Sequence, residues 1–123
     1  MSISNYGENK ILDAIFNNTA LQEPDRFVKL HIGDPGEAGT SNAAAETTRK
    51  SVTGAAAVSG TFTSVNDLTW TNVAGTETLS HISIWDDLTA GNCYWTGALS
   101  VAKAVTAGDT FTIATGSLTV SVD

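Results

Sequence analysis

The stretch LSHISIWDDLTAGNCYWTGAL, residues 79–99, decides the fold. Side chains of residues 79–85 alternate between two faces, as they do along a half-buried β-strand. One face carries Leu79, His81, Ser83 and Trp85, and the other carries Ser80, Ile82 and Ile84. Turn-forming Asp, Gly and Asn residues follow at 86–92, and a second strand is predicted at 92–99. The stretch therefore indicates two consecutive strands with a turn between them.

The same signal, short strands separated by Gly or Asx turns, recurs over most of the chain. A first strand is expected at 27–32, after the break QEPDR. Further strands are predicted at 49–54, 60–65, 68–73, 109–114 and 117–122. We therefore predict a mainly β fold: one β-sandwich domain over residues 1–123, jelly-roll-like, with one N-terminal α-helix.

Residues 5–18, within a lead segment 1–20, form the one predicted helix. Asn5 is the expected N-cap, with Glu8 three residues further on as in a capping box, and Asn17–Asn18 is the expected end. The apolar side chains fall at helical spacing and make one stripe: Ile11, Leu12, Ile15 and Phe16. Two possibilities stay open: the helix covers one end of its own sheet, or it docks on a neighbouring subunit.

The strand at 27–32 leads into a long loop. Alternation is expected to turn Val28, Leu30 and Ile32 to one face and Phe27, Lys29 and His31 to the other. The loop 33–46 consists mostly of small residues and opens with a Gly-Asp-Pro-Gly turn. A loop of this length is expected to be mobile or to be used for contacts.

The charge and hydropathy of the chain exclude two classes of partner. The net charge is −7, from 13 acidic and 6 basic residues, and only Arg49 and Lys50 are adjacent basic residues. Nucleic acid binding needs clustered Lys and Arg, so we expect no nucleic acid partner. No apolar run approaches the roughly 18 residues of a membrane span, and no secretory leader opens the chain. We expect no membrane partner, and folding in a reducing cytosol.

No catalytic, cofactor or metal site is predicted. Zinc takes three or four ligands at recognisable spacing, and His31 and His81 lie far apart in the sequence. No nucleophile elbow and no phosphate-binding loop are present. The single cysteine, Cys93, cannot form an intrachain disulfide and is expected to be a buried, inert thiol. An enzyme is therefore the weakest functional class.

The three tryptophans, Trp70, Trp85 and Trp95, all lie on predicted strands. Such rings either fill a core or point outward to stack on sugars, as in carbohydrate-binding sandwiches. The core interpretation is favoured, because the chain is short of Phe and Leu.

The last predicted strand also alternates, with Leu118, Val120 and Val122 on one face. A register slip by one residue would place these three side chains in water. An exposed strand edge invites pairing with another chain. We therefore expect this strand to be paired or covered, by its own sheet in the first instance and otherwise by a neighbouring subunit.

The motifs ISNYGENKILDAIF and FVKLHIGDPGEAGT, with the stretch from residue 81 to 123, resemble a family of small virion proteins of tailed bacteriophages. The matching positions are Ser4, Asn5, Tyr6, Glu8, Asn9, Lys10, Asp34, Pro35, Ala38, Gly39, Gly97, Ala98, Leu99, Ala107, Gly108, Asp109, Gly116, Leu118, Thr119 and Val120. Residues 41–78 depart most from the family. The resemblance implies a non-enzymatic structural part of a virion, synthesised in the host cytoplasm.

An acidic chain without a basic patch fits the outside of a virion better than its DNA-facing side. The leading hypothesis is a capsid decoration (cement) protein on the exterior of the head, bound to the major capsid protein as a homotrimer at symmetric lattice points. The alternatives are a minor tail or tail-fibre-base subunit bound to tail proteins, and a carbohydrate-binding host-attachment module. The candidate assembly contacts are Ile11, Leu12, Ile15, Phe16, Leu118, Val120 and Val122.

Overall fold

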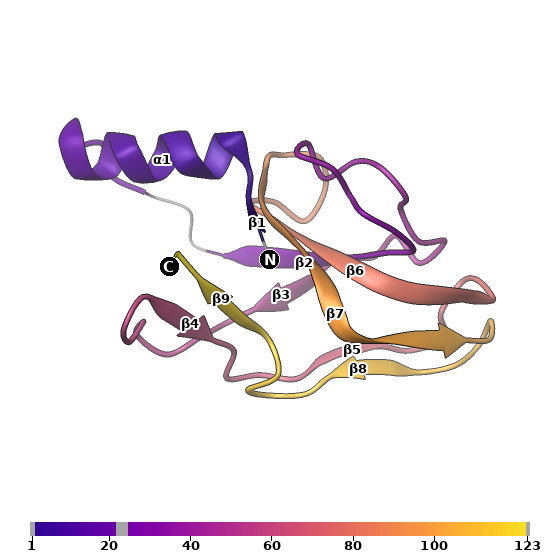
Figure 1. Ribbon diagram of the computed structural model, residues 1–123. Helices are drawn as coiled ribbons and strands as arrows, with labels where there is room; N and C mark the ends of the chain where they lie inside the picture. The colour runs from indigo at the N-terminus through magenta and orange to yellow at the C-terminus, as the bar shows by residue number, and fades with distance from the viewer. Residues whose placement is uncertain (1, 22–24, 123) are drawn as a thin grey trace.

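The computed structural model describes residues 2–21 and 25–122 (Figure 1). Among these residues there is one helix, α1 (Asn5–Phe16). The strands are β1 (Ser2–Ile3), β2 (Arg26–His31), β3 (Lys50–Val52), β4 (Thr61–Thr63), β5 (Leu68–Trp70), β6 (Glu77–Trp85), β7 (Cys93–Val105), β8 (Phe111–Ile113) and β9 (Thr119–Ser121). All strand pairs are antiparallel. The predicted mainly β fold with one N-terminal helix is confirmed.

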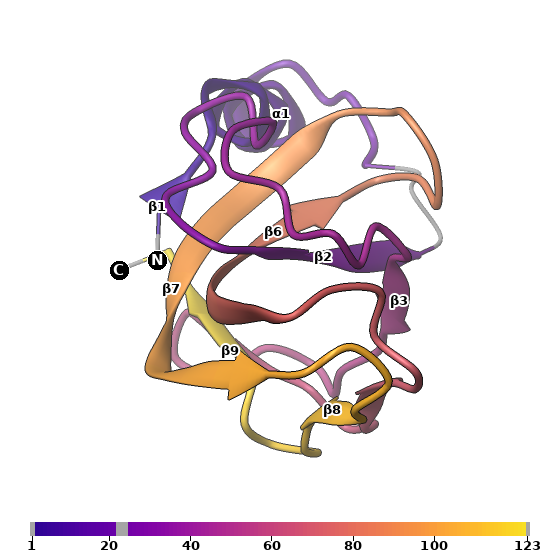
Figure 2. The same ribbon diagram turned by 90° about the vertical axis from the view of Figure 1, so that its right-hand side faces the viewer.

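Five strands form the main sheet, in the order β1-β7-β6-β2-β3. Its longest ladder joins β6 to β7, and β7 curves so that its first part lies beside α1 and its last part beside β8 (Figures 1 and 2). The register shifts between Leu79 and His81. Because this β-bulge breaks the two-residue period, Leu79 and Ile82 both reach the core. The strict alternation predicted for residues 79–85 is therefore wrong at its start.

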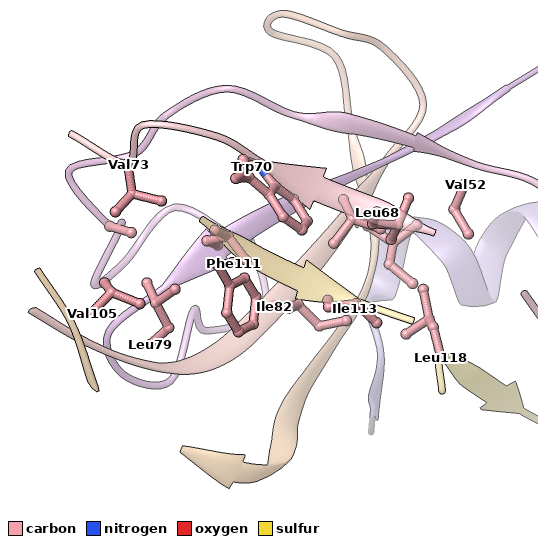
Figure 3. Packing of buried hydrophobic residues seen from close by; sticks show 14 residues of the cluster. Val52, Leu68, Trp70, Val73, Leu79, Ile82, Val105, Phe111, Ile113 and Leu118 are labelled. Carbon is pink, nitrogen blue, oxygen red and sulfur yellow. The ribbon is translucent and has the colours of Figure 1, made fainter. Parts of the chain in front are cut away.

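Two short ladders form the second layer: β4 with β9, and β5 with β8. The core lies between this layer and the main sheet (Figure 3). It comprises Val28, Leu30, Ala44, Val52, Leu68, Trp70, Val73, Leu79, Ile82, Ile84, Val105, Phe111, Ile113 and Leu118. The rings of Trp70 and Phe111 lie 5.9 Å apart between centroids, and the Trp70 indole N–H donates to the carbonyl of Thr48 at 2.7 Å. The N–H of the buried indole therefore has a hydrogen-bond partner.

The last strand pairs within its own molecule. In the β4–β9 ladder Phe62 lies opposite Val120, and the Ser64 N–H donates to the carbonyl of Leu118 at 2.9 Å. The expectation that this strand is paired by its own sheet is confirmed for the edge that faces β4.

The N-cap of α1 is Ser4, so the prediction of Asn5 is wrong. Ser4 has an extended backbone, and its hydroxyl accepts a hydrogen bond from the Gly7 N–H at 3.1 Å. Glu8 is consequently the fourth residue of the helix, outside the capping-box position. The predicted end is correct: Asn17 is the C-cap, and Asn18 adopts a positive φ of 52°.

The alternation predicted for residues 27–32 ends one residue early, so Ile32 does not share the burial of Val28 and Leu30. The strand β2 ends at His31, and Ile32 is about half exposed. The His31 side chain is fully buried on the opposite face of the sheet, where its Nδ1 lies 2.9 Å from the carbonyl oxygen of Ser41. The loop that follows β2 therefore covers this face.

The loop 33–46 is anchored to its own molecule. Its Pro35 is fully buried, and the Glu37 carboxylate accepts a hydrogen bond from the Asn5 N–H at 3.1 Å. Gly39 has a φ of 70°, and a Cβ there would lie 2.6 Å from the Cys93 Sγ, so only glycine fits. The loop therefore makes contacts within its own chain, and its mobility stays a prediction.

Candidate assembly surface

The first turn of α1 is fixed against β7. The Ser4 N–H donates to the carbonyl of Tyr94 at 2.8 Å, and the Ser4 hydroxyl donates to the carbonyl of Cys93. Gly7 lies so close to this strand that a Cβ would be 2.8 Å from the carbonyl oxygen of Tyr94. The sequence Ser-Asn-Tyr-Gly at residues 4–7 thus serves to attach the helix.

Two aromatic rings and two cations extend this attachment. The rings of Tyr6 and Tyr94 meet edge to face at 5.2 Å between centroids. The Arg26 guanidinium lies 4.5 Å from the centre of the Tyr94 ring, and the Lys10 Nζ lies 5.4 Å from that of Tyr6. These ring and cation contacts end at the second turn of the helix, so they do not hold the last turns of α1 in place.

The last turns of α1 present apolar side chains to solvent. Leu12 is 52% exposed, Ile15 67% and Phe16 76%. We call these three residues the helix-end face. In Figure 1 the C-terminal end of α1 extends away from β7. The possibility that the whole stripe covers the molecule's own sheet is therefore wrong for these residues, and docking on a neighbour stays a prediction.

An apolar groove, here called the helix groove, runs beside α1 and has a volume of about 320 Å³. Its lining is drawn from α1, the segment after it, and both layers of strands: Lys10, Ile11, Leu21, Arg26, Val52, Ala57, Gly60, Phe62, Ile84, Tyr94, Trp95, Val120 and Val122. Among these described residues two are basic and none is acidic. The groove therefore combines an apolar lining with positive charge.

The structure divides the seven predicted assembly contacts into three groups. Leu12, Ile15 and Phe16 form the helix-end face, while Ile11, Val120 and Val122 line the helix groove. Leu118 is 4% exposed and belongs to the core, so it offers no surface to a partner. Ile11 and the last strand, which are far apart in sequence, thus meet in the helix groove.

Sequence reasoning missed part of the groove. Leu21, Phe62 and Trp95 line it as well. Leu21 carried a usable signal, because it is a lone large apolar residue in the polar segment after the helix. Phe62 and Trp95 carried none, since alternation does not tell which layer ends beside the helix.

A second groove, of about 640 Å³, lies between the last part of β7 and the β8–β9 region. The strand β1 pairs with β7 only at Trp95 and Thr96, so no described strand covers the outer edge of β7 beyond them. Val101 on this edge is exposed, and Lys103 is the only charged residue of β7. Proline, several charged side chains or a covering element usually prevent an exposed strand edge from pairing with another chain, and this edge has only Lys103.

The tryptophans do not form a sugar-stacking surface. Trp70 and Trp85 are buried, and Trp95 is partly buried against the core. The core interpretation is confirmed for Trp70 and Trp85, while Trp95 also lines the helix groove. The carbohydrate-binding alternative therefore loses the feature on which it rested.

A serine and a histidine lie at hydrogen-bonding distance in the interior. The Nε2 of His31 is 2.7 Å from the Ser83 Oγ, and that oxygen accepts a hydrogen bond from the Trp85 indole N–H at 2.7 Å. His31 Nδ1–H donates to a backbone carbonyl, so Nε2 accepts from the Ser83 hydroxyl. Both residues are fully buried, and burial lowers the pKa of His31. The pair has the spacing of a nucleophile and base, but a substrate has no path to it.

Two further reactive groups are buried in structural roles. The Arg49 guanidinium lies 4.2 Å from the centre of the Trp85 ring and donates to the carbonyls of Asp87 and Ala90, both at 2.7 Å. It thereby fixes the turn between β6 and β7. Burial raises the pKa of the Cys93 thiol to about 11. The prediction that Cys93 is buried is confirmed, and its inertness stays a prediction.

Within residues 2–21 and 25–122, no three His, Cys, Asp or Glu side chains lie close enough together to hold a metal ion. The helix of the described chain is too short and too polar to cross a membrane.

Comparison with known proteins identifies a family. The protein family described as "Podophage GP4 fiber I protein gp80" matches residues 2–121 of the chain. No curated protein sequence matches. Because the match extends over nearly the whole chain, the chain belongs to this family of phage virion structural proteins.

Proposed function

From membership of a phage fibre family, we propose that this chain is a non-enzymatic structural subunit of a podophage fibre, bound to tail proteins. The observation that carries the proposal is the family match from residue 2 to residue 121. The helix-end face supports it, since a subunit needs apolar surface that its own fold leaves exposed.

The placement of the reactive side chains supports a role without catalysis. His31, Ser83 and Cys93 are buried and have structural hydrogen bonds or packing contacts. Arg49 is committed to backbone carbonyls. The helix groove is lined mainly by aliphatic and aromatic residues, which suit protein contacts.

Capsid decoration is the second candidate, with the major capsid protein as partner. It is favoured by the net charge of −7, which suits the outside of a particle. A fibre is also outside the particle, so charge does not separate the two. The family description favours the fibre. In either place we expect a homo-oligomer, with a homotrimer as the leading prediction.

Labelling of purified virions tests the proposal. Antibody against the recombinant chain, detected by gold particles in electron microscopy, is expected at the tail, with a few to tens of copies per virion by quantitative mass spectrometry. Uniform labelling of the head with hundreds of copies would establish decoration instead. If purified virions contain no chain at all, both candidates are wrong.

A further inference from the structure

We propose that the groove between the last part of β7 and β8, here called the strand groove, receives an extended segment of a different virion protein. The segment adds a strand between β7 and β8 and carries an acidic side chain beside Lys103. The inference deepens the proposed function and rests on it in one respect: it takes the chain to be a virion subunit.

The two strands that border the strand groove are consecutive in the chain but do not pair with each other. β8 pairs with β5 in the second layer, while β7 pairs with β6 in the main sheet. Over the part of the chain that the structure describes, no backbone hydrogen bond outside these ladders involves residues 98–104 or 110–113. Each strand therefore has an edge with unpaired N–H and C=O groups, and residues of both strands line the same groove.

The last part of β7 is exposed on both of its faces. Residues 100–104 are all exposed, although the side chains of consecutive strand residues point to opposite faces. In β8, by contrast, Phe111 and Ile113 are buried and Thr112 between them is exposed, as expected for a strand that covers a core. The last part of β7 thus has room for a neighbour that its own chain does not supply.

The bulge in the β6–β7 ladder favours a single segment over the edge of another sheet. Lys103 lies opposite Leu79 and Ala98 opposite His81, so residues 99–102 stand opposite Ser80 alone. Extra residues on one strand bend it, and the last part of β7 curves toward β8 (Figures 1 and 2). A straight sheet edge does not follow this curve between two layers, whereas one extended peptide does. Such a peptide pairs on both sides, through the main chain, as in strand addition to a sheet.

The size and the lining of the strand groove suit such a peptide. Its volume of about 640 Å³ lies within the range of roughly 300–1,000 Å³ found for ligand pockets. The exposed part of the lining consists mainly of alanine, serine and threonine. The buried part belongs to the core and comprises Ile82, Phe111, Ile113 and Leu118. A segment with apolar side chains at every second position would cover this core surface with one face and leave its other face in solvent.

The charge of the strand groove favours an acidic segment from another protein. Lys103 is the one charged residue of the described lining, and no carboxylate lines the groove with it. An Asp or Glu beside Lys103 would complement this charge. A second copy of this chain is a poor donor, since its described strands are all paired in ladders and its net charge of −7 would repel the first copy.

Hydrogen–deuterium exchange tests the main-chain pairing, by comparing the isolated chain with the chain in purified virions. The amides of both walls, 98–103 and 111–113, should exchange at least about tenfold more slowly in the virion. Unchanged exchange in the virion would overturn the inference. Equal protection in the isolated chain would also overturn it, because the groove would then be filled without another protein.

A matched pair of variants tests the charge. In virions that contain Lys103→Glu, the amides of both walls should exchange as fast as in the isolated chain, because like charges then meet. Lys103→Arg keeps the charge and should keep the protection. Lys103 is exposed, so neither change should alter the circular dichroism of the pure chain. Protection that persists in Lys103→Glu virions would overturn the inference.

A photo-crosslinker identifies the occupant. The change Val101→p-benzoylphenylalanine places the reactive group on the groove, and Val58→p-benzoylphenylalanine is a similarly exposed control outside its lining. Irradiated virions should give a crosslink from position 101, and not from position 58, to a segment of a different virion protein that contains Asp or Glu. Crosslinks between copies of this chain alone, or none from position 101, would overturn the inference.

The two proposals fail in different ways. If gold labelling finds the chain at the tail but the groove exchanges as in the isolated chain, this inference is wrong and the proposed function stands. If the chain covers the head and position 101 crosslinks to a capsid protein, the inference stands and the fibre function is wrong. If virions contain no chain, both are wrong.

Discussion

Replacing Leu118 by alanine should destabilise the fold strongly, whereas the same change at Val122 should not. Both residues belong to the predicted apolar face of the last strand. Leu118 is 4% exposed and part of the core, while Val122 is 65% exposed. The change Leu118→Ala removes three carbon atoms worth about 0.8 kcal/mol each, before any penalty for the cavity.

The cavity penalty at this site should be small. Leu118 also lines the groove between β7 and β8, so neighbouring side chains have room to relax. We therefore expect a loss of about 3 kcal/mol, in the lower half of the roughly 2–5 kcal/mol seen for buried Leu→Ala changes. The control Val122→Ala should stay within about 0.5 kcal/mol of wild type.

Urea unfolding at a concentration where the chain is monomeric measures both values. With a slope of about 1.5 kcal/mol/M, Leu118→Ala should lower the midpoint by about 2 M without changing the slope. Equal midpoints for the two variants would refute the division of this strand into a core residue and a surface residue.

Three further outcomes are expected. The free energy of unfolding should fall as the pH drops below about 6.5. Burial lowers the pKa of His31 in the folded protein, so the unfolded chain binds the proton first. Urea midpoints that do not change between pH 7.5 and 5.5 would contradict this. Gly39→Ala should be more destabilising than Gly36→Ala by about 1–3 kcal/mol, because both glycines have φ near 70° but only at position 39 would a Cβ clash, as thermal or urea unfolding of the pair would show. A thiol reagent at pH 8 should label Cys93 slowly in the native protein and at once in urea, since burial raises its pKa to about 11; fast native labelling would disagree with the packing described.

Local signals predicted the elements well, because they depend on neighbouring residues. The turn residues located the strands to within a few positions, with the exception of β7, which runs on to Val105 without the predicted break after residue 99. The short strand β1 was missed, since two residues carry no periodicity.

The orientation of side chains was harder to predict, because it depends on partners distant in sequence. The bulge between Leu79 and His81 arises from pairing with β7, and it reverses the faces that alternation assigns. Alternation placed His31 on the face opposite Val28 and Leu30 without indicating what covers that face; His31 is fully buried because the loop 33–46 covers it. Neither effect is visible in a single strand.

The location of the candidate assembly surface also depends on contacts between residues distant in sequence. The apolar stripe of α1 predicted that the helix packs against another surface, but not which one. The contacts of Gly7 and Tyr94 fix only the first turns of the helix against β7, and the sequence does not indicate this. Leu118 and Val122 look equivalent by alternation. They differ because the strand passes from the interior at its start to the helix groove at its end.

Exposed apolar side chains are not all equally informative about function. Single ones such as Val58 and Val101 are ordinary on any protein surface. Leu12, Ile15 and Phe16 differ, because they are contiguous on one helix and lie near an apolar groove to which the same helix contributes. Because His31, Ser83 and Cys93 are buried, the proposed function in assembly points to this exposed apolar surface.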